Sequence, residues 1–367
     1  MNLATDLTYM QRCIELALKG EFSSKPNPRV GCVIVKDGLV LAEGWHQFAG
    51  EVHAEVHALE KAGSAASGAC LYVTLEPCSH HGKTAPCCDA IIAAGIRKVV
   101  YGMIDPNPKV AGKGLSKLKA AGVEIIGPVL AEECAALNPG FIKRMTSGLP
   151  YVRCKMAMSL DGRTAMASGE SKWITGTEAR QDAQLWRARS SAIISGIDTL
   201  KIDDPSLNVR LDDQTVVQPL RVICDSQLQL PASAKTLQTA GTLILASAVE
   251  QSFQSDINCK ANVEQVYLPD NNGKVDLAAL LKFLVQEKEV NEVLIEAGST
   301  LAGAFIAAGL VDELLIYVAP KLLGHRALPM FEIPGINKLQ DHIALEFMDV
   351  LLLGKDCRMR ARVLEKQ

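Results

Sequence analysis

The chain has 367 residues, of which 48% are hydrophobic and 22% are charged, and its formal net charge is −3 at pH 7. This length predicts two domains, each large enough to bury its own core. Residues 1–147 carry 15 lysines and arginines against 14 acidic residues, and the remainder carries 23 against 27. Because neither part is basic, the composition argues against a nucleic acid as substrate or partner.

Cysteine usage and apolar patterning bear on the cellular compartment. Eleven cysteines, an odd number, are scattered along the chain and predict free thiols in the cytoplasm. The first helix is expected over residues 7–18, with apolar residues on one face and charged residues between them, so it resembles a docking helix and not a signal peptide. No stretch contains 18 consecutive apolar residues, so no membrane span is predicted.

Helices and strands alternate in the first part of the chain. The apolar run 30–35 predicts a buried strand, and Asp37-Gly38 predicts a hairpin turn into residues 39–42. The further predicted elements are helix 54–62, strand 70–75, helix 87–94, strand 98–102, helix 115–121 and strand 123–126. This order predicts a mixed α/β sheet with helices on both faces.

A segment rich in turn-forming and basic residues, 138–150, predicts a linker, and we place the domain boundary near residue 147. Beyond it the predicted elements are strands 151–158, 190–195, 221–224 and 242–246, helix 277–287, strand 293–295, helix 301–308 and strand 314–319. A polar loop at residues 199–210 offers candidate binding groups.

The strongest chemical signal comes from His53, Cys78 and Cys87. One imidazole and two thiolates give a tetrahedral zinc ion three protein ligands and leave the fourth position for water, as a catalytic site requires. Zinc lowers the pKa of bound water to about 7. Glu55 lies two residues after His53, about 200° around a helix, so it suits a proton carrier better than a ligand.

This constellation departs from the pattern of zinc-dependent base deaminases, His-x-Glu followed by Pro-Cys-x-x-Cys, at one point. Eight residues separate Cys78 from Cys87, where that pattern has two. His57 lies on the same helix face as His53, but His-Ala-Glu-Val-His is not the metalloprotease pattern, and we predict that His57 packs against its neighbours. The alternative metal ligands are His57, His80, His81 and Cys88.

In the second region, the sequence Glu-Ala-Gly-Ser-Thr at residues 296–300 joins a predicted strand to a predicted helix. Free N–H groups and the helix dipole favour a phosphate at such a turn, although Gly-Ser-Thr is also an ordinary capping turn. The Gly-x-Gly-x-x-Gly fingerprint is absent. Trp173 could stack on a planar ring or lie in a core, and Arg187 could bind a phosphate or pair on a helix surface.

Together these motifs resemble the bifunctional riboflavin-biosynthesis proteins, in which a pyrimidine deaminase is fused to a pyrimidine reductase. The resemblance covers nearly the whole chain, and the eight-residue spacing of the two cysteines belongs to this family. The matching pieces of the first region are Asn27–Gly31, His53–Ala58, Thr74–Thr84 with Pro86-Cys87, and Asp105–Gly114. Those of the second region are Ser159–Gly162, Gly169–Ile174, Asp203–Leu207 and Glu296–Gly298.

The resemblance implies one zinc ion per chain on His53, Cys78 and Cys87, with Glu55 as the catalytic proton carrier. It implies hydrolytic deamination of 2,5-diamino-6-ribosylamino-4(3H)-pyrimidinone 5′-phosphate. NADPH would then reduce the ribosyl group to ribityl, which gives 5-amino-6-ribitylaminouracil 5′-phosphate. The implied folds are a cytidine-deaminase-like three-layer α/β/α domain over 1–147 and a dihydrofolate-reductase-like α/β domain over 148–367.

Matching by position also implies the reductase site. The residues implied to bind NADPH are Ala157, Trp173, Thr199, Asp203, Ser226, Gly298, Ser299, Thr300, Leu301, Ala302, Gly303 and Ala304. Those implied to bind the pyrimidine sugar phosphate are Ser171, Arg187, Leu207, Arg210 and Glu296. The expected partners are this small-molecule substrate and further copies of the chain in a dimer or tetramer, without nucleic acid or membrane.

Two other functions stay open at this point. A nucleobase or tRNA deaminase fused to an unrelated nucleotide-binding domain would need a basic face, which the charge count does not supply. A zinc-stabilised binding module without catalysis would have no use for Glu55.

Overall fold

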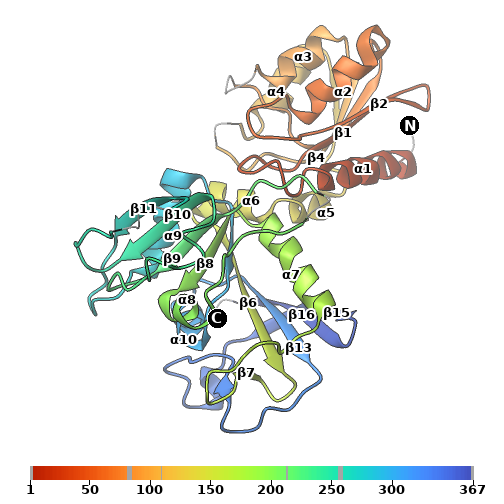
Figure 1. Cartoon of the computed structure of the whole chain (residues 1–367). Coiled ribbons are helices and arrows are strands. Elements are labelled where there is room, and N and C mark those ends of the chain that lie inside the picture. Colours follow the sequence, from red (N-terminus) through yellow and green to blue (C-terminus); the bar gives the residue numbers. More distant parts are fainter. Residues whose placement is uncertain (1–2, 81–84, 109, 212–213, 255–258, 365–367) are drawn as a thin grey trace. The chain divides into compact units, whose positions relative to one another are not determined.

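The structure is a computed structural model of the chain, and it describes residues 3–80, 85–108, 110–211, 214–254 and 259–364. The chain divides into two compact units, Met1–Gly148 and Leu149–Gln367 (Figure 1). Each unit has its own sheet and its own buried clusters. No helix in these described ranges is long and apolar enough to cross a membrane.

The first unit is built around a five-stranded sheet in the order β2-β1-β3-β4-β5. Strand β1 is antiparallel to β2 and β3, whereas β3, β4 and β5 run parallel. The strands are β1 (Gly31–Lys36), β2 (Leu39–Trp45), β3 (Cys70–Leu75), β4 (Lys98–Met103) and β5 (Glu124–Ile126). The helices are α1 (Leu3–Leu18), α2 (Ala54–Ala62), α3 (Cys87–Ala93), α4 (Lys113–Ala120), α5 (Ala131–Ala136) and α6 (Pro139–Ser147), with a 3-10 turn η1 (Gly63–Ala66).

Helices cover both faces of this sheet, and β1 shows why its sequence is apolar throughout. Cys32 and Ile34 point into a core shared with α2, α3 and α4. Val33 and Val35, which alternate with them, point into a second core shared with α1 and α5. A strand buried on both faces needs apolar residues at every position. The predicted three-layer α/β/α arrangement is therefore confirmed.

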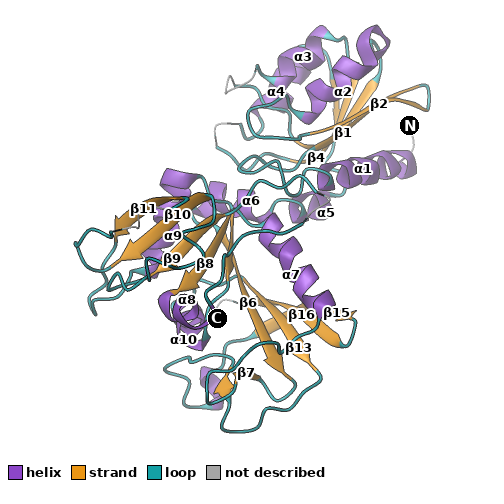
Figure 2. Cartoon of the chain, in the orientation of Figure 1, coloured by secondary structure: helices purple, strands orange, loops and turns teal. Residues whose placement is uncertain are grey.

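The second unit contains a nine-stranded sheet in the order β11-β10-β9-β8-β12-β6-β13-β16-β15 and a two-stranded sheet of β7 and β14. The strands from β11 to β13 in that order are parallel, β16 is antiparallel to β13, and β15 is antiparallel to β16 (Figure 2). The strands are β6 (Tyr151–Ser159), β7 (Arg163–Ala165), β8 (Ala192–Gly196), β9 (Leu220–Cys224), β10 (Gly241–Ser247), β11 (Ala261–Tyr267), β12 (Glu292–Ile295), β13 (Glu313–Ala319), β14 (Leu328–Pro329), β15 (Leu345–Leu353) and β16 (Asp356–Val363). The helices are α7 (Thr177–Arg189), α8 (Ile197–Asp203), α9 (Leu277–Lys288) and α10 (Ser299–Ala307), with a 3-10 turn η2 (Leu339–Asp341).

Buried ion pairs join the central strands of this sheet. Arg153 on β6 is buried and donates to Glu292 on β12 and, at 3.0 Å, to Glu313 on β13. Glu313 also accepts from Arg360 on β16 at 2.6 Å. A buried charge is tolerated only when it is paired, so these contacts hold β6 and β12 side by side. Ala157 of the candidate reductase site lies on β6, and Glu296 directly follows β12.

The structure corrects two sequence-based expectations and adds elements that the sequence did not predict. Segment 138–150, predicted as a linker, forms helix α6, because Pro139 is tolerated in the first helical turn and Gly148 ends the helix with a φ of 69°. The polar loop predicted at 199–210 begins inside helix α8. Helix α7, strand β11 and the hairpin β15–β16 had no sequence prediction, since their sequences lack a clean apolar period.

Candidate active sites

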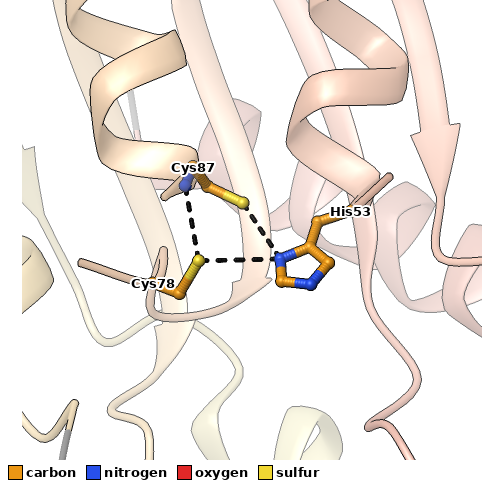
Figure 3. Close-up of side chains that lie close together, drawn as sticks. All are labelled: His53, Cys78 and Cys87. Atoms are coloured by element: carbon orange, nitrogen blue, oxygen red, sulfur yellow. Dashed lines mark hydrogen bonds between the residues drawn. The ribbon is translucent and has the colours of Figure 1, made fainter. Parts of the chain in front are cut away.

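Three metal-ligating side chains meet at the carboxyl end of β3 (Figure 3). His53 immediately precedes α2, Cys78 follows β3, and Cys87 begins α3. The Nδ1 atom of His53 lies 3.1 Å from Sγ of Cys87 and 3.6 Å from Sγ of Cys78, and the three ligand atoms lie within 4.8 Å of one another. This donor set fits zinc, which prefers imidazole nitrogen and thiolate sulfur in a tetrahedral arrangement.

The pKa values of the three side chains depend on one another, because the side chains are hydrogen-bonded to each other. Hydrogen bonds from Cys87 and His53 lower the pKa of Cys78 to about 4, although its burial acts in the opposite direction. The same neighbour, Cys78, raises the pKa of Cys87 and of His53. Cys78 is therefore the more acidic of the two thiols, and a cation at the centre of the group would favour ionisation of both.

Glu55 lies in the first turn of α2, only 4% exposed, and is not a member of the metal group. Its burial raises the pKa of the carboxyl, while the nearby His53 lowers it. A carboxyl whose pKa is raised toward neutrality can both accept and donate a proton, which general acid/base catalysis requires. The position suits the proton-carrying role that the sequence motif predicts.

The alternative ligands pack elsewhere. The His57 ring lies edge-on to Trp45, with centroids 5.6 Å apart, so the packing prediction for His57 is confirmed. The thiol of Cys88 donates to the carbonyl oxygens of Pro77 and Gly114 at 3.4 and 3.5 Å. His80 is exposed and outside the metal group, and His81 lies outside the described residues.

One neighbour of the metal group, His46, had no sequence prediction. Its ring lies 5.4 Å from the ring of His53 and perpendicular to it. Nδ1 of His46 donates to the carbonyl of Val52 at 3.2 Å, and Nε2 accepts from the side-chain amide of Asn27 at 3.0 Å. Burial lowers the pKa of His46 to about 4, so this imidazole is neutral. Only Asn27 could have been found from the sequence, as part of a family motif.

In the second unit, four parallel strands, β9, β8, β12 and β6, are neighbours and end at one edge of the sheet. The residues implied to bind NADPH follow these ends: Thr199 lies on α8, Ser226 follows β9, and Gly298 caps α10. Helices α8 and α10 begin close together, because a Cβ on Gly196 would lie 3.2 Å from the side chain of Leu301. Ligands of α/β sheets bind at this edge.

The start of α10 fits an anion. Its N-cap is Gly298, its first turn carries no acidic residue, and a Cβ built on Gly298 would meet nothing within 4 Å. The hydroxyls of Ser299 and Thr300 donate to the carboxylate of Glu332 at 3.3 and 3.0 Å. The N–H groups at a helix N-terminus suit a nucleotide phosphate as their acceptor. In this structure, the anion that accepts from the hydroxyls of Ser299 and Thr300 is the carboxylate of Glu332. We call this first turn of α10, residues 298–300, the anion cradle.

The remaining residues of the implied run 298–304 are less accessible to a ligand. Ala302 packs in the core, and Gly303 is pressed against the backbone of Glu332, where a Cβ would lie 2.0 Å from its carbonyl oxygen. The side chain of Leu301 faces α8 near Gly196. Contacts to a ligand from these positions would therefore have to come from backbone atoms.

Arg187 and Glu296 form the centre of the implied substrate site. Two nitrogens of Arg187 donate to the two carboxylate oxygens of Glu296 at 2.6 and 2.8 Å, and a third donates to the carbonyl of Asn208 at 3.1 Å. Burial would raise the pKa of Glu296, but the charge of Arg187 lowers it to about 2. Arg187 on α7 therefore pairs with Glu296, which follows β12, and not with a neighbour on the surface of its own helix. Lys155, whose Nζ lies 3.9 Å from Glu296, is an addition that no local pattern indicated.

The other implied substrate residues are placed differently. Leu207 is buried in a core cluster, so only its backbone could reach a ligand. Arg210 is exposed, and its backbone N–H donates to Gln184 at 2.9 Å. Ser171 is half-buried, as is Ala157 on β6.

Trp173 is 67% exposed, so of the two alternatives that the sequence left open, packing in a core is excluded. The Arg180 guanidinium lies 4.6 Å from the ring centroid, and Lys321 donates to the Trp173 carbonyl at 2.9 Å. The preceding residue, Lys172, lies 3.5 Å from the carboxylate of Asp203 on α8. These contacts attach the Trp173 segment to α8 and leave an indole that can stack on a ring.

Comparison with known proteins identifies both units. Residues 3–103 match the cytidine and deoxycytidylate deaminase zinc-binding region, and residues 150–358 match the RibD C-terminal domain. The chain therefore joins a zinc-dependent deaminase domain to a reductase domain.

Relatives match over nearly the whole length. The riboflavin biosynthesis protein RibD of Escherichia coli is 48% identical over 362 residues, which cover 96% of this chain and 97% of the relative, and that of Haemophilus influenzae is 45% identical over 368 residues, covering 96% of each. The solved structure of Acinetobacter baumannii RibD, form 1, is 48% identical with a TM-score of 0.92, covering 99% of this chain and 100% of that one. A diaminohydroxyphosphoribosylaminopyrimidine deaminase/5-amino-6-(5-phosphoribosylamino)uracil reductase from Thermotoga maritima is 34% identical with a TM-score of 0.88, covering 99% of each chain.

This chain belongs to the RibD family, whose members are bifunctional deaminase/reductase enzymes of riboflavin biosynthesis. Zinc and NADPH are the cofactors of the two activities. The predicted fold class and the predicted pair of activities are confirmed.

The geometry of the metal group predicts which thiols hold zinc. The wild-type chain should purify with about one zinc ion, and Cys87→Ser should lose most of it, because a neutral hydroxyl is a poor substitute for a thiolate ligand. Cys88→Ser is the matched control, since that thiol points to two carbonyl oxygens. Metal analysis of the purified proteins measures this. Zinc loss in Cys88→Ser with retention in Cys87→Ser would show that the adjacent cysteine is the ligand.

Proposed function

We propose that residues 1–147 deaminate 2,5-diamino-6-ribosylamino-4(3H)-pyrimidinone 5′-phosphate and that residues 148–367 then reduce its ribosyl group to ribityl with NADPH. The observation that carries the deamination is the group of His53, Cys78 and Cys87 with buried Glu55 beside it. The deaminase and reductase activities named for the Thermotoga maritima relative support the same substrate class for this chain. Ammonia release from the purified chain before NADPH is added, and NADPH oxidation afterwards, tests the order of the two steps.

In the deaminase site, His53, Cys78 and Cys87 would hold the zinc ion, which would supply an activated water to the ring carbon that carries the amino group. Glu55 is placed to accept a proton at its carboxylate and to give it to the amino group, which leaves as ammonia. Its burial keeps bulk water away from this transfer. The neutral His46 next to His53 adds no charge that would compete with the metal, and its two ring nitrogens are held by Val52 and Asn27.

In the reductase site, NADPH supplies the hydride that the opened ribosyl group accepts. The anion cradle would hold a phosphate of the cofactor, and the exposed face of Trp173 would stack on one of its rings. The ion pair of Arg187 and Glu296 with Lys155 nearby presents fixed charges to the sugar phosphate. All of these groups belong to segments at or beside the carboxyl edge of the sheet.

Replacing Glu55 separates proton transfer from metal binding. Glu55→Gln keeps the side-chain volume but cannot titrate, so zinc should stay bound while ammonia release falls by at least about 10²-fold. The same variant should still oxidise NADPH when the deaminated intermediate is supplied, because the reductase residues lie in the other unit. Ammonia and absorbance assays measure the two steps. Normal deamination by the variant would remove Glu55 from the mechanism.

Two substitutions at the anion cradle test where NADPH binds. Gly298→Val places a branched side chain in the open space at the start of α10 and should weaken NADPH binding sharply. Glu332→Gln should tighten binding by roughly fivefold, because the cofactor phosphate no longer meets a negative charge at the hydroxyls of Ser299 and Thr300. Quenching of tryptophan fluorescence gives the dissociation constants.

The matched control for the charge change is Glu287→Gln, an exposed carboxylate on α9. It should leave NADPH affinity unchanged. If Gly298→Val melts like the wild type and binds NADPH normally, the cofactor does not use this cradle. Weaker binding by Glu332→Gln would make Glu332 a ligand of the cofactor and not its competitor.

We propose further that the chain is a cytoplasmic homo-oligomer, a dimer or a tetramer. The free cysteines support a reducing compartment. Strand β15 supports self-association, because it is an edge strand of the nine-stranded sheet and exposes several large apolar side chains. The most exposed of these are Phe347, Val350 and Leu352.

A charge on β15 should therefore weaken the oligomer. Leu352→Glu should lower the molar mass of the full chain in light scattering, whereas Leu339→Glu, at an even more exposed leucine in η2, should not. An unchanged mass in Leu352→Glu, or a monomeric wild type, would show that β15 is not the contact surface.

A further inference from the structure

Glu76, two residues before the metal ligand Cys78, has a carboxylate that is surrounded by backbone N–H groups. The side chain is 3% exposed. Its Oε2 atom accepts from the N–H of Gly112 at 2.8 Å and of Asp105 at 3.2 Å. Its Oε1 atom accepts from the N–H of Gly114 at 2.9 Å and of Leu115 at 3.3 Å. One buried carboxylate thus binds two stretches of backbone, the start of the loop after β4 and the first turn of α4.

The contacts of Oε1 replace a helix cap. The N-cap of α4 is Gly112, which has no side chain, and the first turn of the helix carries no acidic residue. The N–H groups of Gly114 and Leu115, the second and third helical residues, have no partner within a helix. Glu76 accepts both from a neighbouring strand end and brings a negative charge to the positive end of the helix.

The four contacts need a carboxylate in particular. An ionised glutamate is an acceptor at both oxygens, so each oxygen can take two N–H groups. A glutamine in the same place has one acceptor oxygen and one NH₂ group, which would face two N–H donors. Whichever way the amide lay, either the helix cap or the loop contact would be lost.

The same region is packed against the metal-binding segment. The backbone N–H of Glu76 donates to the carbonyl of Met103 at 2.9 Å, which extends the pairing of β3 with β4. A Cβ on Gly114 would lie 2.0 Å from the carbonyl oxygen of Pro77, so the two backbones are in direct contact. The Cys88 thiol, on the residue after a metal ligand, donates to both of those segments.

The loop residues 104–108 lie at the same sheet edge as the metal group. They follow β4, the parallel neighbour of β3, and therefore share the sheet edge that carries Cys78. Asp105 is buried at this edge, and its carboxylate accepts from the backbone N–H of Asn107 at 2.8 Å. The backbone of this loop is fixed to the metal-binding strand through Glu76.

We propose that Glu76 is a positioning residue for deamination. It contacts neither the metal nor the substrate, and it holds loop 104–108 and the first turn of α4 against the segment that carries Cys78. This fixes one wall of the pyrimidine site relative to the metal. The inference rests on the deaminase activity of this unit, and its role differs from those of the ligands and of Glu55.

The test is Glu76→Gln in the full-length, zinc-loaded chain. Zinc should stay near one ion per chain, while kcat/KM for ammonia release should fall by about 10²-fold, mostly through a higher KM, because the wall is misplaced and the chemical groups are not. Amide hydrogen exchange should quicken in residues 104–108 and 112–115 and stay unchanged in β1 and α1. Oxidation of NADPH with the deaminated intermediate should be normal, because it depends on the other unit, while retained zinc and unchanged exchange in β1 and α1 show that the first unit is folded.

Two matched variants make the result specific. Glu76→Asp keeps the charge and both oxygens on a shorter side chain and should restore part of the KM and of the exchange protection. Glu43→Gln removes a carboxylate of the same unit that pairs with Arg12, and it should change neither quantity.

Three outcomes would overturn the proposal: unchanged exchange in residues 104–108 and 112–115, an unchanged KM despite faster exchange, or loss of zinc as severe as that in Cys87→Ser. The last would mean that Glu76 acts through the metal ligands. A wild-type chain that released no ammonia would count against the proposed function instead, and the exchange measurement would still decide whether Glu76 holds the loop.

Discussion

Both candidate sites depend on one constraint, the shared edge at which neighbouring parallel strands end. In the first unit this edge brings Cys78, which follows β3, next to the loop that follows β4. In the second unit it gathers the ends of β9, β8, β12 and β6, and with them the anion cradle and Glu296. Backbone groups at such an edge have left the hydrogen-bonded ladder, and the helices that follow present free N–H groups. Polar ligands and charged side chains can therefore be satisfied there, while the middle of each sheet stays apolar.

Three carboxylates near these edges have different roles, because the groups that surround them differ. Glu296 is paired with Arg187, which lowers its pKa to about 2 despite its burial, so it stays charged and can serve as a fixed electrostatic element. Glu76 accepts hydrogen bonds from four backbone N–H groups, so its carboxylate holds two backbone segments in place. For Glu55 the largest effect is burial, which raises the pKa of the carboxyl, while His53 and Cys87 act in the opposite direction. It is therefore the carboxyl among the three whose surroundings favour proton transfer.

The parts of the structure that the sequence predicted well are those with local signals. Helix α2 and strand β3 begin and end at the predicted residues, because a glycine stops the helix and an unbroken apolar run defines the strand. The metal group was predicted because its residue types are rare and chemically specific. The contacts of Lys155 and Glu332 could not be, since each joins segments more than 30 residues apart with no repeating pattern. Helix α6 was missed for the opposite reason: its proline and glycine, read as turn formers, bracket a helix.

Some glycines in the family motifs lie where two backbone segments are in direct contact. A Cβ on Gly31 would lie 2.0 Å from the carbonyl oxygen of Cys13 on α1, so this motif residue allows the first helix to lie against β1. Gly112 has a φ of 78°, which other residues rarely adopt, and Gly114 touches the backbone of Pro77. These glycines allow the close backbone packing that holds the reactive groups in position. A motif match therefore identifies a site together with its scaffold, and only distances and protonation separate the residues that react from those that hold them in place.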